Sequence, residues 1–203
     1  MNTSSLMRSF AISPILRNRH MTAVLGYRKM SDKHQNRAEH LVLTALQSRD
    51  PDILSAQIVD IQQLSPTVKG YTLKVSKNET YPTYRAGQWL DLFIPNVDMV
   101  GGFSMWGSPS RLEKEHVLDL AVKFSEWPPA HWLHTAATVG SNVAVRIGGD
   151  FYYEQPDGDH DVLLLAGGVG INPLASILFH VAEKMSEFLC FLDNYSEYIK
   201  ISK

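Results

Sequence analysis

The sequence has 203 residues, a single cysteine and a net charge of only −2. One cysteine, Cys190, excludes an intramolecular disulfide and a zinc or iron–sulfur site built from cysteines of this chain. The small net charge argues against a dedicated nucleic-acid-binding domain, which is usually basic. The longest uncharged apolar run, 162–171, has ten residues and three glycines, too few and too interrupted to span a bilayer. We therefore expect no nucleic-acid partner, no membrane span and no metal site.

What is present is an ordinary globular composition, 44% hydrophobic, with a marked charge asymmetry. Residues 1–50 carry eight Lys or Arg against three Asp or Glu, and the first acidic residue is Asp32. An Arg-rich, Ser-bearing and acid-free start is typical of a mitochondrial transit peptide. We expect residues 1–50 to be such a peptide and a linker, and the protein to be mitochondrial; a disordered tail is the alternative.

Residues 51–160 have the pattern of an antiparallel β-barrel. Short runs rich in Val, Ile, Leu and aromatic residues alternate between two faces, as half-buried strands do, and turn signals separate them. The expected strands are Ile53–Ile61, Thr67–Val75, Gln88–Ile94, His116–Phe124 and Asn142–Ile147. A helix is expected over Ala130–Ala137, after Pro128 and Pro129. Several short strands at this spacing favour a sandwich or a closed barrel.

Residues 161–203 have a different pattern. The continuous apolar run 162–166 fits a parallel strand buried on both faces, and an amphipathic helix follows from Leu174 to Val181. A glycine-rich turn lies between them and consists of Gly167, Gly168, Val169, Gly170, Ile171 and Asn172. Glycines let the backbone approach a pyrophosphate, and the following helix offers unpaired N–H groups. The turn is neither a P-loop nor the usual G-x-G-x-x-G, and a turn that only permits close packing is the alternative reading.

The order of these pieces, and the stretch Ala-Gly-Gly-Val-Gly-Ile-Asn-Pro at 166–173, resembles the ferredoxin–NADP reductase-like flavoprotein family. The resemblance covers about residues 51–186. It implies a Greek-key barrel of the FAD-binding type, followed by the first β-α unit of an α/β NAD-binding domain. It also implies NAD(P) at the glycine turn, hydride transfer between nicotinamide and FAD, and an electron acceptor whose identity stays open.

The family's flavin signature is only partly kept. Its Arg-x-Tyr-Ser aligns with residues 101–104, where Phe103 keeps an aromatic ring for stacking and Ser104 keeps the hydroxyl near the flavin N5, which makes Ser104 the candidate catalytic residue. Gly101 replaces the arginine that neutralises a flavin phosphate. The later Gly-x-x-Ser-x-x-Leu aligns with 127–133, where Trp127 and Ala130 replace the glycine and the serine. These losses leave both FAD binding and a weak or empty flavin site open. Trp106, Trp127 and Trp132 fit either a flavin-facing surface or a core.

After the first strand and helix, the family pattern is not continued. We expect Glu187–Leu192 to give one partial neighbour to the strand at 162–166 but not a sheet, and the NAD-binding domain of residues 161–203 to be incomplete. Two classes of function follow. The first is an NAD(P)H-dependent flavin oxidoreductase, impaired in this chain by truncation. The second is a non-catalytic barrel module that binds flavin or a protein partner.

Overall fold

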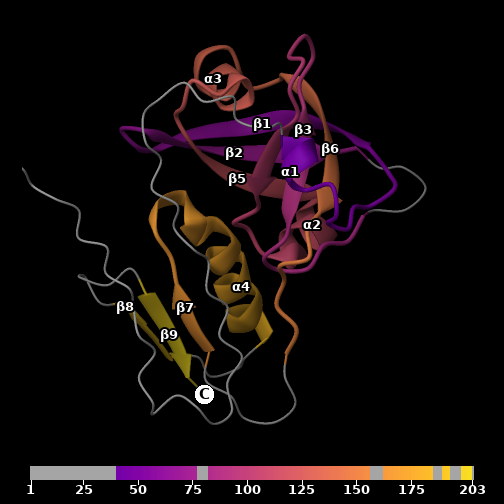
Figure 1. The fold of residues 1–203 in the computed structure, drawn as a ribbon. Helices are drawn as coiled ribbons and strands as arrows, with labels where there is room; N and C mark the ends of the chain where they lie inside the picture. Colours follow the sequence, from indigo (N-terminus) through magenta and orange to yellow (C-terminus); the bar gives the residue numbers. More distant parts are fainter. Residues whose placement is uncertain (1–39, 77–81, 156–161, 185–188, 193–197, 203) are drawn as a thin grey trace, which may run out of the picture.

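The computed structural model describes residues 40–76, 82–155, 162–184, 189–192 and 198–202 (Figure 1). A six-stranded sheet forms the larger part. A long helix, α4 (Ile171–Lys184), and a three-stranded sheet lie beside it. Among the helices of the described residues, none is long and apolar enough to cross a membrane.

The six-stranded sheet is antiparallel throughout, with the order β4-β3-β6-β1-β2-β5. Its strands are β1 (Leu54–Ser65), β2 (Val68–Val75), β3 (Trp89–Phe93), β4 (Gly101–Ser104), β5 (Val117–Lys123) and β6 (Asn142–Gly148). Buried and exposed residues alternate strictly over the first half of β1, because successive side chains of a strand point to opposite faces. The five strands expected from the sequence are confirmed.

The sheet curls around one hydrophobic core, but its hydrogen-bonded ladder is not closed. The edge strands β4 and β5 meet only beyond the end of β4, where an isolated bridge joins Met105 to Leu120. Closure was expected, and β4 explains why it is incomplete: the strand has four residues, all paired with β3. Leu90, Leu120 and Val145 are fully buried inside the curl.

Three helices accompany this sheet. The short α1 (His40–Leu43) precedes it, α2 (Pro109–Glu115) connects β4 to β5, and α3 (Pro128–Thr135) lies between β5 and β6. Prolines occupy the first turns of α2 and α3, where a missing N–H costs no helical hydrogen bond. The expected helix over residues 130–137 is therefore confirmed, and it begins and ends two residues earlier than expected.

The smaller sheet has the order β7-β9-β8, with β7 (Val162–Leu165), β8 (Leu189–Leu192) and β9 (Tyr198–Ser202). Two expectations were wrong here. The strand at 162–165 is not in a parallel pair: its neighbour is β9, which lies between β7 and β8 and runs antiparallel to β7. Residues 189–192 do belong to a sheet, paired with β9 and not with β7. Leu164 is buried, whereas Leu163 and Leu165 are exposed.

The helix α4 has the amphipathic pattern that the sequence predicts. Leu174, Ile177 and Val181 are buried together with Leu164 of β7, and this second small core also includes Ala86 of the larger part. The glycine turn, which joins β7 to α4, is thereby placed against the six-stranded sheet.

Candidate functional site

The glycine turn contains a single 3₁₀ turn, Gly168–Gly170, and α4 begins directly after it at Ile171. Gly168 has φ +56°, in the left-handed region that favours glycine. A Cβ added at Gly168 or Gly170 would meet nothing within 4 Å. The two glycines are therefore not required by close packing, which was the alternative reading of the turn, and their backbone is open to a ligand.

Asn172 ties the turn to the six-stranded sheet. Its side chain is 6% exposed, and Nδ2 donates a hydrogen bond of 2.7 Å to the carbonyl oxygen of Ala121 in β5. An amide held this way keeps the glycine turn at a fixed place on β5. Of the residues assigned to the turn from sequence, Asn172 thus has a positioning role, whereas Val169 and Ile171 are partly exposed.

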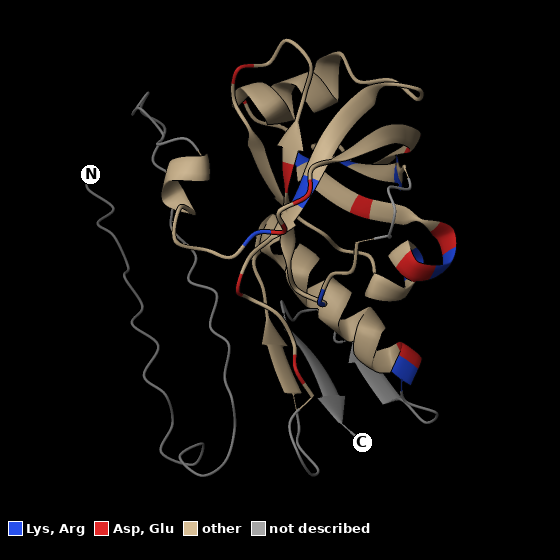
Figure 2. Cartoon of the chain, turned by 90° about the vertical axis from the view of Figure 1, so that its right-hand side faces the viewer, with Lys and Arg blue, Asp and Glu red and all other residues tan. Residues whose placement is uncertain are grey.

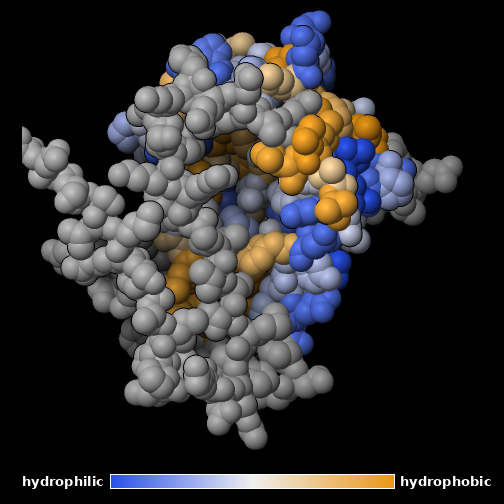
Figure 3. All heavy atoms as spheres, viewed as in Figure 1, coloured by the Kyte–Doolittle hydropathy of each residue, from blue (hydrophilic) through white to orange (hydrophobic). Residues whose placement is uncertain are grey.

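Two neighbouring cavities lie between the six-stranded sheet and α4, and Figure 3 shows the surface hollowed there, with apolar residues on both sides. The smaller has a volume of about 420 Å³ and contains the glycine turn on one wall and β2 and β5 on the other. The larger has a volume of about 580 Å³ and reaches along α4 to Glu183. Leu64 and Trp106 line both, so the two form one groove.

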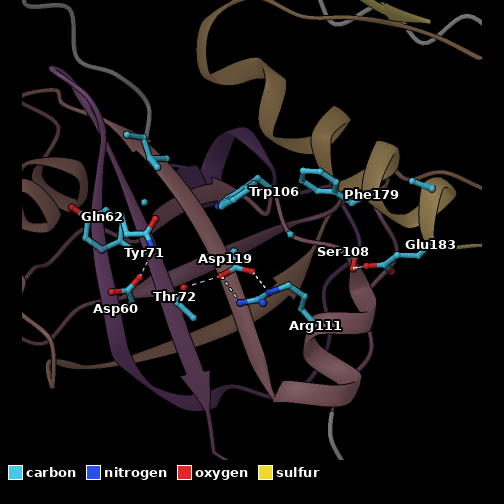
Figure 4. Close-up of a pocket in the computed structure, with 14 residues that line it drawn as sticks. Asp60, Gln62, Tyr71, Thr72, Trp106, Ser108, Arg111, Asp119, Phe179 and Glu183 are labelled. Atoms are coloured by element: carbon cyan, nitrogen blue, oxygen red, sulfur yellow. Dashed lines mark hydrogen bonds and ion pairs between the residues drawn. The ribbon is translucent and has the colours of Figure 1, made fainter. Parts of the chain in front are cut away.

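Several polar side chains of the larger cavity are paired with one another (Figure 4). Asp119, 5% exposed, accepts hydrogen bonds of 2.9 Å from Thr72 Oγ1 and 2.6 Å from Arg111 Nε. The hydroxyl of Ser108 donates to Glu183 Oε1 at 2.7 Å, which connects the start of α2 to the end of α4. These pairs hold the walls of the groove together. The glycine turn lies in the wall of the smaller cavity and is accessible there.

The structure does not bring Phe103 and Ser104 to the glycine turn, because neither residue lines the groove. The two lie on opposite faces of β4. Phe103, opposite Leu90 in the register with β3, packs against the core. The ring of Phe103 also covers Gly101, where an added Cβ would collide with it and would lie 2.9 Å from the Cβ of Pro129. The space that the family's arginine needs is thus filled.

The start of α3 offers little to a phosphate. Trp127 is the residue before the helix and makes no side-chain cap, and Pro128 and Pro129, the first two helical residues, have no N–H to donate. Ala130 is buried and has no hydroxyl. The residues at Gly101 and at this helix therefore do not fit the phosphates of FAD in the family's manner. Of the three tryptophans that fitted either a flavin-facing surface or a core, Trp132 packs against the core.

Part of the N-terminal region that was expected to be a transit peptide and linker contacts the six-stranded sheet. The segment 40–50, which we call the N-terminal strap, lies along β3 and β6, and acidic and basic residues gather where it crosses (Figure 2). Asp91 of β3 is fully buried and accepts hydrogen bonds from His40 Nε2 at 2.9 Å, Arg49 Nε at 3.0 Å and Arg146 Nη2 at 2.7 Å. A buried aspartate in the apolar strand 89–93 was the signal in the sequence, since such a carboxylate needs partners.

The strap is built closely onto the sheet. An added Cβ at Gly102 would collide with the ring of His40, and the Arg49 guanidinium lies 5.0 Å from the centre of the Trp89 ring. Burial acts to raise the pKa of Asp91, but the hydrogen bonds from His40, Arg146 and Arg49 outweigh it and lower that pKa to about 2. Asp91 therefore stays ionised and holds the strap in place.

Among the described residues, no group of three or more His, Cys, Asp and Glu side chains could hold a metal ion. The site is thus defined by the glycine turn, by Asn172 and by the groove containing Trp106. The chain thus combines a curled antiparallel sheet with a strand, a glycine turn and a helix that follow it.

Solved structures share this fold. The chain matches phthalate dioxygenase reductase with a TM-score of 0.54 and 17% identity, over 65% of this chain and 40% of that one. It matches the FAD/NAD-binding domain of a nitric oxide dioxygenase from Vibrio cholerae with a TM-score of 0.54 and 22% identity, over 64% and 57%. The fold is that of the ferredoxin reductase-like flavoproteins, as the sequence predicted.

Comparison with curated proteins identifies more similar relatives. The chain is 50% identical over 151 residues to Oxidoreductase NAD-binding domain-containing protein 1 of Danio rerio, which covers 73% of this chain and 55% of that protein. It is 43% identical over 157 residues to the protein of the same name in Homo sapiens, covering 76% and 50%. The chain is thus a close homologue of these proteins and spans about half the length of the curated relatives it matches. A scan against family models finds no match.

Proposed function

We propose that this chain is the sheet domain, with the first strand, glycine turn and helix of the nucleotide domain, of an NAD(P)H-dependent flavin oxidoreductase of the ferredoxin reductase type. Such an enzyme moves a hydride between nicotinamide and FAD, and the chemistry belongs to those cofactors. What supports the proposal is the match to proteins named for NAD binding and to FAD/NAD-binding structures.

The observation that carries the dinucleotide part is the open glycine turn at the groove. Gly168 and Gly170 expose their backbone, Asn172 fixes the turn on β5, and a cavity of about 420 Å³ adjoins it. In this proposal the turn binds the pyrophosphate, since glycines allow its close approach and the start of α4 supplies N–H groups and a positive dipole end. The adjoining cavity then receives the part of the dinucleotide next to the pyrophosphate.

A second function has one specific observation in its favour. The ring of Phe103 fills the place of the missing arginine, and Pro128 and Pro129 remove two N–H donors. A flavin bound here has its phosphates held by other groups. Two charge-assisted contacts of about 1.5–3 kcal/mol each are absent, which favours weak flavin binding and a module that binds without turnover.

One spectroscopic experiment separates the two functions. The full chain is purified, its absorbance is recorded in the flavin bands with and without added FAD, and NADH or NADPH is then added anaerobically. The oxidoreductase predicts flavin bands that bleach on addition of the reduced dinucleotide. Bands that do not bleach indicate the non-catalytic module, and a chain that takes up neither flavin nor dinucleotide refutes the proposal.

We also propose that residues upstream of the strap direct the protein to mitochondria. The support is compositional: five basic residues and no acidic one precede Asp32. Because His40 and Arg49 contact Asp91, we expect any cleavage to fall before His40. Import of the labelled chain into isolated mitochondria, followed by N-terminal sequencing of the imported product, tests this. An unprocessed chain that stays outside, or a cut after Arg49, contradicts it.

A further inference from the structure

Trp106 stands between the two cavities of the groove. It follows the end of β4, and its backbone N–H donates to the carbonyl oxygen of Asp119 at 3.1 Å. Its ring meets that of Phe179 from α4 edge-on, with 6.0 Å between the ring centres and 63° between the planes (Figure 4). The indole is thus held between the sheet and α4, and it lines the same cavity as the glycine turn.

The indole nitrogen of Trp106 is the unusual feature. Nε1 is buried, and no described residue accepts a hydrogen bond from it. Buried indole N–H groups usually find a partner, and one without a partner is costly for the fold. A bound ligand with an acceptor atom in the groove removes that cost.

The walls around Trp106 indicate the kind of ligand. In the smaller cavity they are largely apolar, with Val68 and Ala121 from the sheet and Val169 and Ile171 from the turn and α4. A largely apolar cavity with the unpaired indole N–H of Trp106 in its wall, next to an open glycine turn, fits a planar ring that bears an acceptor and is attached to an anionic group. A nicotinamide ring with its carboxamide oxygen, joined through ribose to a pyrophosphate, has these features.

We propose that Trp106 is a positioning residue for the nicotinamide of NAD(P)H. The ring lies in the smaller cavity against the indole, and its carboxamide oxygen accepts the hydrogen bond from Trp106 Nε1. The inference rests on the proposed function, because it needs a dinucleotide whose pyrophosphate is at the glycine turn. It adds a residue that selects which ring of the dinucleotide enters the groove.

The test compares Trp106→Phe with Trp132→Phe on the full chain. The first variant keeps an aromatic ring and removes the N–H; the control makes the same change at a tryptophan that packs against the core and does not line the groove. Calorimetric titrations use NADH and, separately, ADP-ribose, which has the pyrophosphate and adenine but no nicotinamide. We expect Trp106→Phe to weaken NADH about three- to tenfold, to leave ADP-ribose unchanged, and not to lower the melting temperature.

Each other outcome has a definite meaning. Equal NADH affinity in the wild type and Trp106→Phe overturns the inference and leaves the proposed function standing. Equal weakening of NADH and ADP-ribose means that the adenine end contacts Trp106, and the nicotinamide assignment is wrong. A wild type that binds neither ligand refutes the dinucleotide site itself.

A second measurement on the wild type keeps the inference testable if Trp106→Phe fails to fold. It uses a dinucleotide whose ring lacks the carboxamide. We expect this analogue to bind the wild type about three- to tenfold more weakly than NADH, and equal binding overturns the inference.

Discussion

Replacing Asp91 by alanine should release the N-terminal strap and destabilise the sheet domain. Asp91 is fully buried and is the common acceptor for His40, Arg49 and Arg146, of which the first two belong to the strap. Alanine removes the acceptor and leaves these three donors without a counter-charge. The change therefore breaks a buried ion-pair network and not a surface pair.

The expected loss follows from the exposure of the partners. Breaking a buried ion pair costs about 3–5 kcal/mol when one charge is left buried. The side chains of Arg49 and Arg146 are 15% and 24% exposed, so water can solvate them in part after the change. We therefore expect the lower end, about 3 kcal/mol, or about 10 °C in the melting temperature.

The same network predicts a pH dependence. The pKa of Asp91 is lowered in the fold to about 2, from an ordinary value near 3.8. A carboxylate with a lowered pKa stabilises the fold above its unfolded pKa, and this stability is lost as the pH falls through the folded pKa. The wild type should lose about 2 kcal/mol from this group between about pH 5 and pH 2, and Asp91→Ala should lack this loss.

Urea unfolding, followed by circular dichroism at pH 7 and at several lower pH values, measures both effects. The matched control is Asp98→Ala, which changes an exposed aspartate and should stay within about 0.5 kcal/mol of the wild type. A chain that begins at residue 51 provides a second check, since Asp91→Ala should cost less there, with His40 and Arg49 absent. Equal stability of Asp91→Ala and Asp98→Ala, or an Asp91→Ala cost unchanged by that truncation, refutes the role given to the network.

Three further predictions concern the packing at β4 and the glycine turn. Gly101→Ala places a Cβ against the Phe103 ring and should cost about 1–3 kcal/mol in urea unfolding, whereas Gly170→Ala, with open space around it, should be tolerated; the reverse order contradicts the packing at β4. Asn172→Ala removes the hydrogen bond to the Ala121 carbonyl oxygen and should speed amide hydrogen exchange in α4 and the glycine turn without changing exchange in β3. Exchange in α4 and the turn that is unchanged by the substitution would contradict the role of Asn172 in holding the turn on β5. Gly168→Ala forces a Cβ onto a residue at φ +56° and should cost about 1–2 kcal/mol and weaken NADH; unchanged affinity removes the turn from the site.

Periodicity made most of the large sheet predictable. The strands at 54–65, 68–75 and 117–123 alternate apolar and polar side chains over much of their length, so their existence follows from the sequence, although β1 continues four residues beyond its expected end at Ile61. The strand β4 was recognised only as a signature, because Gly101 and Gly102 carry no side chain from which a period can be detected. The direction of the partner of β7 was not predictable, since an apolar run fits parallel and antiparallel sheets alike.

The glycine turn was predictable as a motif, whereas the surroundings of the flavin signature were not. The resemblance assigned Phe103 and Ser104 to a flavin, and in the structure these neighbouring residues lie on opposite faces of β4. The contact of the Phe103 ring with Gly101 could not be predicted, because it depends on how the side chain packs. The sequence alone could not separate the roles of Trp106 and Trp132. In the fold, Trp106 lines the groove, whereas Trp132 packs against the core.

The strap also has a consequence for the order in which the chain folds. Its contacts join residues 51 positions apart at Asp91, and about twice as far at Asp150, whose carboxylate accepts from the N–H of Ser48. The partners of residues 40–50 lie in and beside β3 and β6, so the strap cannot make its contacts until that part of the sheet has been synthesised. In unfolding, a force applied at the N-terminus reaches the strap first and peels it from Asp91 while the strands behind it still hold.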